Sequence, residues 1–376
     1  MRVVVAPDSF AGTLTAIDAA AAMAAGWQAA RPGDTLVEVP VADGGEGTVH
    51  VVAAASGSTT RSARVAGPLG APVDADWLLL ADGTAVIEMA AASGLALVAP
   101  DDRDPRRTTT RGTGELVRAA LDAGARRVVV GLGGSATNDG GAGLAQALGA
   151  RLLDGAGAEL APGGAALAGL ARIDLTGLDP RLAEVDVVAA TDVDNVLCGP
   201  DGASAVYGPQ KGAGPGAVAE LDAALRRWAD VLGAAVPAAR GVAEEPGAGA
   251  AGGLGAALLA LCGARRESGA AVVLGLIGFR RRLARADLVV TGEGCLDPQS
   301  LRGKAPVAVA DAARAVGLPC VAVAGRVEAG RRELAAAGID AAYAVVDIAP
   351  SYDDAVGDAA VWVAELAARV AREWSR

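Results

Sequence analysis

Two lysines and two asparagines are the residues of this chain whose types and positions best indicate chemistry. Lys211 and Lys304 are the only lysines among 33 basic residues, and Asn138 and Asn195 are the only asparagines. All four lie in Gly- or Asp-rich segments. A lysine ammonium is a compact point charge, whereas an arginine guanidinium is a wide planar fork, so the two differ where one cation must meet one oxygen. Although asparagine also suits ordinary turns, the four positions together predict loops that bind phosphate or metal.

A glycine-rich segment, GGSATNDGG, spans residues 133–141 and follows the strand predicted at 127–130, which is apolar from Val128 onward. A strand that leads through such a turn into a helix offers backbone N–H groups and the positive end of the helix dipole to an anion. Simple N-capping would need only one Ser, Thr, Asn or Asp. The segment therefore predicts a phosphate site that is neither a Walker A loop nor a clean dinucleotide fingerprint. Its candidate residues are Gly133, Gly134, Ser135, Thr137, Asn138 and Asp139.

Two aspartates, Asp192 and Asp194, follow the strand predicted at 185–190, and Asn195 comes next. Side chains two residues apart in an extended segment point to one side. Paired carboxylates suit Mg²⁺, which binds a few carboxylates together with substrate phosphates. One of the two could instead be the base for a substrate hydroxyl. A solvated turn is the alternative that these residues alone leave open.

Polar side chains also follow three predicted parallel strands at the two ends of the chain. They are Asp8 and Ser9 after the first strand, Asp43 and Glu46 after the second, and Glu293 after a strand at 286–290. Open α/β sheets bind ligands at the carboxyl edge of their strands. We therefore expect these side chains to face a ligand, although acids and glycines are also common in ordinary strand-to-helix turns.

Composition limits the function classes. A net charge of −11 and a pI near 4.7 argue against nucleic acid and anionic membranes as partners. The uncharged run at 246–264 is largely Gly and Ala and predicts a buried helix rather than a membrane span. The four cysteines include no Cys-x-x-Cys pair, and the chain starts directly in a strand pattern without a signal peptide. We expect a cytoplasmic protein with reduced thiols.

Strand and helix patterns alternate at both ends of the chain, whereas short runs around 64, 77 and 86 indicate antiparallel strands. At 376 residues the chain is long enough for two domains. We predict a discontinuous parallel-sheet α/β domain from 1–60 and 284–376. A second, mixed α/β domain at 61–283 would be inserted into it and would carry the glycine-rich segment.

Taken together, these segments resemble the bacterial glycerate kinase family, in its type-1 form. The matching segments run in order along nearly the whole chain: 6–10 (APDSF), 41–48 (VADGGEGT), 133–141, 192–195 (DVDN) with 198–200 (CGP), 208–213 (GPQKGA), 247–255 (GAGAAGGLG), 291–294 (TGEG) and 303–306 (GKAP). The resemblance implies a flavodoxin-like domain with a second α/β domain inserted. It also implies ATP-dependent phosphorylation of glycerate, typically at the 2-hydroxyl.

The resemblance leads us to expect ATP and Mg²⁺ as cofactors, and we allow for a homodimer. In this reading Asp192 or Asp194 holds the metal near the phosphates, and Lys211 and Lys304 neutralise phosphate oxygens or the glycerate carboxylate. Asp43, Glu46 and Glu293 become candidates for substrate hydroxyls or metal-bound water.

Two positions depart from the pattern that many relatives of this family share. Ala11 stands where many carry Lys, and Cys295 stands where many carry Arg, while Asp297 is kept. The nucleotide or acid preference is therefore open. The alternative function is a non-catalytic sugar-acid sensor on the same scaffold, which the presence of both aspartates and both lysines disfavours.

Overall fold

The computed structural model describes residues 1–10, 12–298 and 300–375, and its contacts divide the chain into two units. Unit 1 comprises Met1–Asp43, His50–Ser56 and Ser268–Arg376; unit 2 comprises Gly44–Val49 and Gly57–Glu267. The protein is therefore an α/β protein of two domains. The contact division places residues 268–283 in unit 1, so the domain limits predicted from the sequence stay a proposal.

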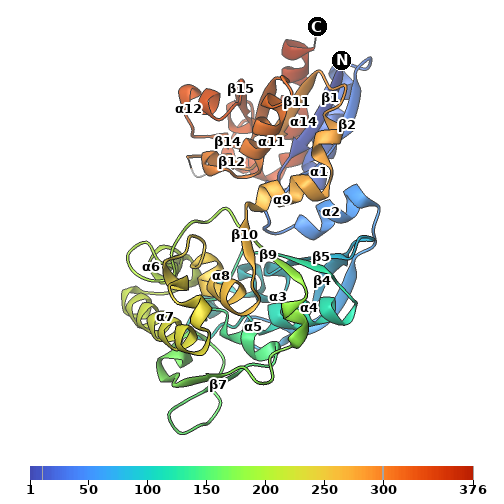
Figure 1. Ribbon diagram of the computed structural model, residues 1–376. Coiled ribbons are helices and arrows are strands. Elements are labelled where there is room, and N and C mark those ends of the chain that lie inside the picture. The colour runs from blue at the N-terminus through green and yellow to red at the C-terminus, as the bar shows by residue number, and fades with distance from the viewer. Residues whose placement is uncertain (11, 299, 376) are drawn as a thin grey trace. The chain divides into compact units, whose positions relative to one another are not determined.

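The sheet of unit 1 is parallel and, within the described residues, has five strands in the order β2-β1-β11-β13-β15 (Figure 1). Its strands are β1 Arg2–Pro7, β2 Thr35–Glu38, β11 Leu288–Gly292, β13 Cys320–Ala324 and β15 Ala341–Ala344. In β1, Val3, Val4 and Val5 are at most 1% exposed. Consecutive buried valines are typical of a parallel strand covered on both faces. Numbered along the chain, the order is 2-1-3-4-5.

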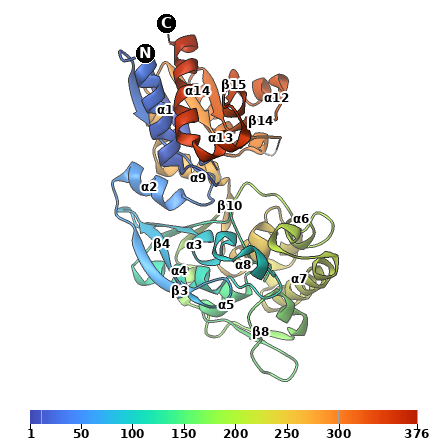
Figure 2. The same ribbon diagram turned by 180° about the vertical axis from the view of Figure 1, so that it is seen from behind.

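Helices cover both faces of this sheet. On one face lie α1 (Ala16–Ala30) and α14 (Ala359–Trp374), and on the other lies α11 (Ala305–Arg314); the two views in Figures 1 and 2 show opposite faces. A Cβ at Gly26 would lie 1.9 Å from the Ala364 carbonyl oxygen, so a glycine is needed where α1 and α14 meet. The smaller elements of unit 1 are α9 Gly269–Leu276, α10 Phe279–Arg282, β12 Cys295–Leu296, β14 Arg326–Val327, α12 Arg331–Ala336 and α13 Tyr352–Gly357. Helix α2 (Thr48–Ser56) has most of its residues in unit 1.

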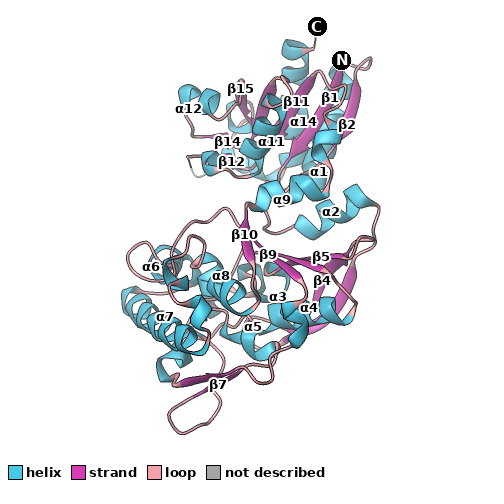
Figure 3. Ribbon diagram, viewed as in Figure 1, coloured by secondary structure: helices cyan, strands magenta, loops and turns pink. Residues whose placement is uncertain are grey.

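The sheet of unit 2 is mixed, with the order β10-β9-β6-β5-β4-β3 (Figure 3). Its strands are β3 Arg61–Ala66, β4 Pro72–Leu79, β5 Thr84–Glu88, β6 Arg127–Gly131, β9 Asp186–Ala190 and β10 Arg265–Glu267. Strands β3, β4 and β5 pair antiparallel, as the sequence predicts, and β5, β6, β9 and β10 pair parallel. The carboxyl ends of β5, β6, β9 and β10 therefore lie along one edge of this sheet.

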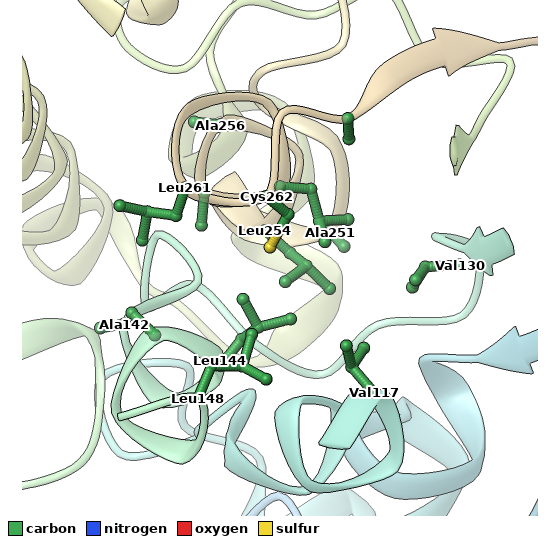
Figure 4. Close-up of a cluster of buried hydrophobic side chains, with 14 of the residues drawn as sticks. Val117, Val130, Ala142, Leu144, Leu148, Ala251, Leu254, Ala256, Leu261 and Cys262 are labelled. Atoms are coloured by element: carbon green, nitrogen blue, oxygen red, sulfur yellow. The ribbon is translucent and has the colours of Figure 1, made fainter. Parts of the chain in front are cut away.

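The helices of unit 2 pack a core that contains few aromatic residues. They are α3 Ala90–Ser93, α4 Arg111–Asp122, α5 Ala142–Ala147, α6 Ala203–Tyr207, α7 Pro215–Ala235 and α8 Ala250–Leu261, with a short hairpin of β7 Arg151–Leu153 and β8 Arg172–Asp174. Figure 4 shows Leu144 and Leu148 of the α5 region beside Leu254 and Leu261 of α8. Aliphatic side chains fill this core, as the low aromatic content predicts.

The uncharged run at 246–264 contains α8, whose residues are largely buried in unit 2. The lack of charged residues in this run is therefore explained by a helix that is buried in the core. In the part of the chain that the structure describes, no helix combines the length and the apolar character that crossing a membrane requires.

Candidate functional site

In unit 1, Asp8 and Glu293 lie side by side because the strands that carry them are in register. Pro7 of β1 pairs with Gly292 of β11, and the Asp8 N–H donates to the Gly292 carbonyl at 2.8 Å. The connections of the sheet reverse direction between these two strands, and such a switch point is where open α/β sheets bind ligands. The predicted residues at the two strand ends are therefore brought together.

Carboxylates gather at this point around one ammonium group. Burial, Asp43 and Glu293 raise the pKa of Asp8 well above its usual value, while the Ser9 N–H and Lys304 act in the opposite direction. Burial is also the largest cause that raises the pKa of Glu293 to about 7, and Ser300 and Lys304 oppose it. Glu293 can thus hold a proton near neutral pH, which an isolated carboxylate does not.

Asp297 and Lys304 belong to the turn and the helix that follow β12. Asp297 accepts the Ser300 N–H at 2.8 Å, and the buried Ser300 hydroxyl donates to the Cys295 carbonyl at 3.1 Å. Lys304 is the N-cap residue of α11 and its side chain makes no capping hydrogen bond. One carboxylate oxygen of Asp297 therefore holds the turn, whereas the Lys304 side chain takes no part in capping α11.

Cys295, which stands where many relatives carry Arg, lies beside an arginine of the neighbouring strand. Cys295 pairs with Arg326 in the β12–β14 ladder, and Nη2 of Arg326 lies 3.8 Å from Cys295 Sγ. A guanidinium is thus present beside Cys295 even though residue 295 is not arginine. The other departure, Ala11, lies outside the described residues.

In unit 2, the first half of the glycine-rich segment packs tightly against the loop at 44–47. A Cβ at Gly133 would lie 2.7 Å from Gly45 Cα, and one at Gly134 would lie 3.1 Å from Glu46 Oε1. Gly134 also has a φ of 72°, which favours glycine. A glycine is therefore required at 133 by space and favoured at 134 by conformation.

The second half of the segment points into the protein. Thr137, Asn138 and Asp139 have no exposed surface. Thr137 Oγ1 donates to the Ala251 carbonyl at 3.3 Å, and Asn138 Nδ2 donates to Ser204 Oγ at 2.9 Å. These side chains hold the loop in place, which leaves Gly133, Gly134 and Ser135 as the part that could meet a ligand directly.

Asp139 makes the largest share of these internal bonds. Its carboxylate accepts the N–H groups of Thr110, Gly141 and Gly143 and the Thr110 hydroxyl, at 2.8–3.1 Å. Burial raises its pKa and the hydrogen bonds oppose the rise. The negative charge therefore fixes the start of α5 rather than facing solvent.

Lys211 is buried, with 2% of its surface exposed. Its Nζ donates to the Thr137 carbonyl at 2.7 Å, and burial lowers its pKa to about 7, which the charge of Asp139 partly opposes. The sequence predicts direct neutralisation of phosphate by this lysine, whereas the structure places the amine behind the loop. Contact with the loop backbone is the role that the geometry shows.

Asp192 and Asp194 follow β9 at the same sheet edge as the glycine-rich segment, since Leu132 N–H donates to the Ala190 carbonyl at 3.1 Å. Asp192 is half-buried, whereas Asp194 is exposed and paired with Arg266. Asn195 is tied to its own loop, donating to the Asp201 carbonyl at 2.8 Å and accepting from the Tyr207 hydroxyl at 2.9 Å. The pair is thus placed as predicted, with one carboxylate engaged by a guanidinium.

Glu88 is a functional candidate that the sequence analysis misses. It ends β5, is 7% exposed, and its carboxylate accepts the N–H groups of Gly47 and Val49. A carboxylate at the start of α2 is favoured by the helix dipole. Glu88 therefore holds the predicted loop at 43–48, and a lone acid ending an apolar run is the one signal that could have indicated it.

Known proteins resemble this chain over almost its whole length. The model of the glycerate kinase family matches residues 3–375. The chain belongs to the glycerate kinase family. A relative named glycerate kinase, from Bacillus subtilis (strain 168), is 48% identical over 99% of this chain and 97% of its own length. A relative named glycerate 2-kinase, from Escherichia coli (strain K12), is 46% identical over 94% of this chain and 93% of its own length.

A solved structure supports the same membership. A protein from Salmonella typhimurium LT2 is 45% identical to this chain, and the comparison covers 99% of this chain and 98% of that one with a TM-score of 0.85. The resemblance of the signature segments to the glycerate kinase family is therefore confirmed over the full chain.

Proposed function

We propose that this chain is a glycerate kinase, which transfers the γ-phosphoryl group of ATP to the 2-hydroxyl of glycerate and yields 2-phosphoglycerate and ADP. The observation that carries the proposal is similarity over almost the whole chain to relatives named glycerate kinase and glycerate 2-kinase. The second of these names supports the 2-hydroxyl as acceptor. A cytoplasmic location and a homodimer stay predictions.

The phosphate contacts are assigned to the exposed half of the glycine-rich segment. Within the described residues, the hydrogen bonds leave the N–H groups of Gly133, Gly134 and Ser135 without a protein acceptor. Successive N–H groups in a glycine turn form a concave site for anions. Phosphoryl transfer depends mainly on such positioning and charge stabilisation, so this segment suits ATP phosphates.

The acceptor is assigned to the carboxyl edge of the sheet in unit 1. Its strand order, 2-1-3-4-5, is that of flavodoxin-like sheets, which supports the flavodoxin-like assignment for this unit. Unit 1 contains segments from both ends of the chain, which supports the insertion of unit 2 into it. Asp8, Ser9, Asp43, Glu293, Asp297 and Lys304 are the residues proposed to surround glycerate there. A carboxylate and hydroxyls are the groups that an ammonium and carboxylates recognise.

Mg²⁺ is proposed as the metal, held by Asp192 with Asp194 as the second candidate. The described residues contain no cluster of three or more His, Cys, Asp or Glu suited to a metal ion. Mg²⁺ nevertheless often uses one or two carboxylates and takes its other ligands from substrate phosphates and water, so the residues fit an ion that arrives with ATP. When bound, the ion would neutralise charge on the phosphates.

Asn substitutions should distinguish the roles of the two aspartates. We expect Asp192→Asn to lower turnover on the order of 10²-fold, similar to the loss of one transition-state contact, and to raise the Mg²⁺ concentration needed for half-maximal rate. Asp194→Asn should have a smaller effect, because Arg266 already neutralises much of that charge. Steady-state rates across a Mg²⁺ titration measure both. Near-normal Mg²⁺ dependence in the Asp192 variant would argue against its metal role.

The proposed function is tested by an assay that couples ADP release to glycerate addition, with tartronate and hydroxypyruvate as alternative acceptors. ³¹P NMR of the product identifies the phosphorylated hydroxyl. A non-catalytic sensor would bind glycerate and release no ADP, and a 3-phosphate product would overturn the proposed acceptor position.

A further inference from the structure

Glu293 carries an unusual feature for a buried carboxylate. It is 9% exposed, and within the described residues its Oε1 has no hydrogen-bond partner. Leaving a buried polar atom unpaired is costly, and such atoms are uncommon in folded proteins. An unpaired acceptor at the switch point of a sheet therefore indicates a ligand that brings a hydrogen-bond donor, such as a hydroxyl group.

The surroundings of Glu293 narrow the ligand to a hydroxy-acid. Lys304 is coupled electrostatically to both Glu293 and Asp8, and it is the positive group among carboxylates that also include Asp43 and Asp297. A ligand that carries both a carboxylate and a hydroxyl can satisfy Lys304 and Glu293 at the same time. These roles for Lys304 and Glu293 rest on the proposed function, because they are roles within that reaction.

We propose that Glu293 is the catalytic base, which accepts the proton of the glycerate hydroxyl while Lys304 holds the glycerate carboxylate. The O–H bond breaks and its proton moves to Glu293 Oε1. The hydroxyl oxygen uses the released pair to bond to the γ-phosphorus. The bond from that phosphorus to the bridging oxygen breaks, and ADP leaves with its electrons. Glu293 then returns the proton to solvent.

The neighbouring acids are less suited to this role. Asp8 accepts the Ser9 N–H at 2.6 Å, and burial together with the charges of Asp43 and Glu293 raises its pKa well above the usual value, which favours its protonated form. Neighbouring carboxylates raise one another's pKa in this way, because like charges in one site repel. Asp297 uses Oδ1 in the Ser300 turn. Glu293, with a pKa of about 7, is substantially ionised at neutral pH and close to the value that suits a general base.

The test compares Glu293→Gln, which keeps the shape and removes the base, with Glu328→Gln, an exposed control that follows β14. General-base catalysis contributes about 10²- to 10⁴-fold, so we expect a fall of that size in kcat for Glu293→Gln. Glycerate binding without ATP, followed by calorimetry, should change only a few-fold. In the wild type kcat should rise with pH through about 7, and this limb should be lost in the variant. The control should match the wild type.

A readout independent of activity uses thermal stability. The pKa of Glu293 is raised on folding, from 4.5 to about 7, so its stabilising contribution is present below pH 4.5 and lost as the pH rises to about 7. The Glu293→Gln variant cannot ionise at this position. Its Tm relative to that of the wild type should therefore be higher at pH 8 than at pH 5.

Each outcome decides between the two proposals. If the wild type does not phosphorylate glycerate, the proposed function fails. If it does, but Glu293→Gln keeps kcat within a few-fold and retains the acid limb, the base assignment is overturned. Glu293→Asp keeps a carboxylate one methylene shorter and should be more active than the Gln variant; equal activity would also overturn the assignment.

Discussion

Replacing Lys211 by arginine is expected to lower both the stability and the turnover of the protein. Lys211 is 2% exposed and its Nζ meets the Thr137 carbonyl at 2.7 Å, beside the buried carboxylate of Asp139. An arginine there would bury a larger group that cannot lose its proton. Because the guanidinium would be buried, we expect a loss of stability as well as a loss of turnover.

The loss of turnover follows from the contact with Thr137. Displacing that carbonyl would move the N–H groups at 133–135 that we assign to phosphate, and displacements of about 1 Å can cost on the order of 10²-fold in rate. We expect kcat to fall by about that factor and Tm to fall by several degrees. Differential scanning fluorimetry and the ADP-release assay measure the two effects. A variant as stable and active as the wild type would show that the site tolerates the guanidinium.

A Lys211→Met variant isolates the charge. Folding lowers the pKa of Lys211 from 10.5 to about 7, so the folded state loses its proton first and wild-type stability should rise as the pH increases from about 7 toward 10. Methionine cannot titrate, so the Tm of the variant minus that of the wild type should fall over that range. A constant difference would contradict the buried-amine interpretation.

The sequence predicts the outline of the fold because the signals are local. Buried valine runs mark β1, β6 and β11, and the acids that follow them lie at strand ends wherever parallel strands pair in register. Asp8 and Glu293 were therefore identifiable without coordinates. Strand β10, with the polar sequence Arg-Arg-Glu, carries no such signal, because an edge strand of three residues needs no apolar face.

The burial of particular side chains depends on contacts that a sequence does not encode locally. Lysine is seldom buried, so nothing around Lys211 indicates that its amine lies inside unit 2. Thr137 and Asn138 turn inward because Gly252 allows the non-helical first turn of α8 to approach; a Cβ at Gly252 would lie 2.0 Å from the Thr137 carbonyl oxygen. The hydrogen bonds of Glu88 to the loop at 43–48 are equally nonlocal.

Replacing Lys304 by serine is expected to make the protein more stable at pH 6 and far less active. Lys304 is the N-cap residue of α11 and forms no side-chain capping bond. Serine is among the best N-cap residues, and a cation at a helix N-terminus opposes the helix dipole, so each term favours serine by roughly 1 kcal/mol or less. A residue that fits its helix this poorly is better explained by the ligand that its charge serves.

The catalytic cost follows from the carboxylates beside it. Among the described residues, Lys304 is the cation that opposes the raised pKa values of Asp8 and Glu293, so its replacement removes that opposing charge, and the glycerate carboxylate loses its proposed partner. We expect the KM for glycerate to rise on the order of 10²-fold, as for a lost charge-assisted bond of about 3 kcal/mol. Lys304 lowers the pKa of Glu293, so its loss should also move the acid limb of the pH–rate profile above pH 7.

Lys304→Arg separates charge from shape at the same position. It keeps the positive charge, so the pH limb should stay near 7, while the planar guanidinium should still raise the KM for glycerate. Melting of both variants at pH 6, where Glu293 is largely protonated, compares the capping effect with little interference from the carboxylates. A serine variant that melts below the wild type at pH 6 and keeps its KM would show that Lys304 stabilises α11 and does not bind the acceptor.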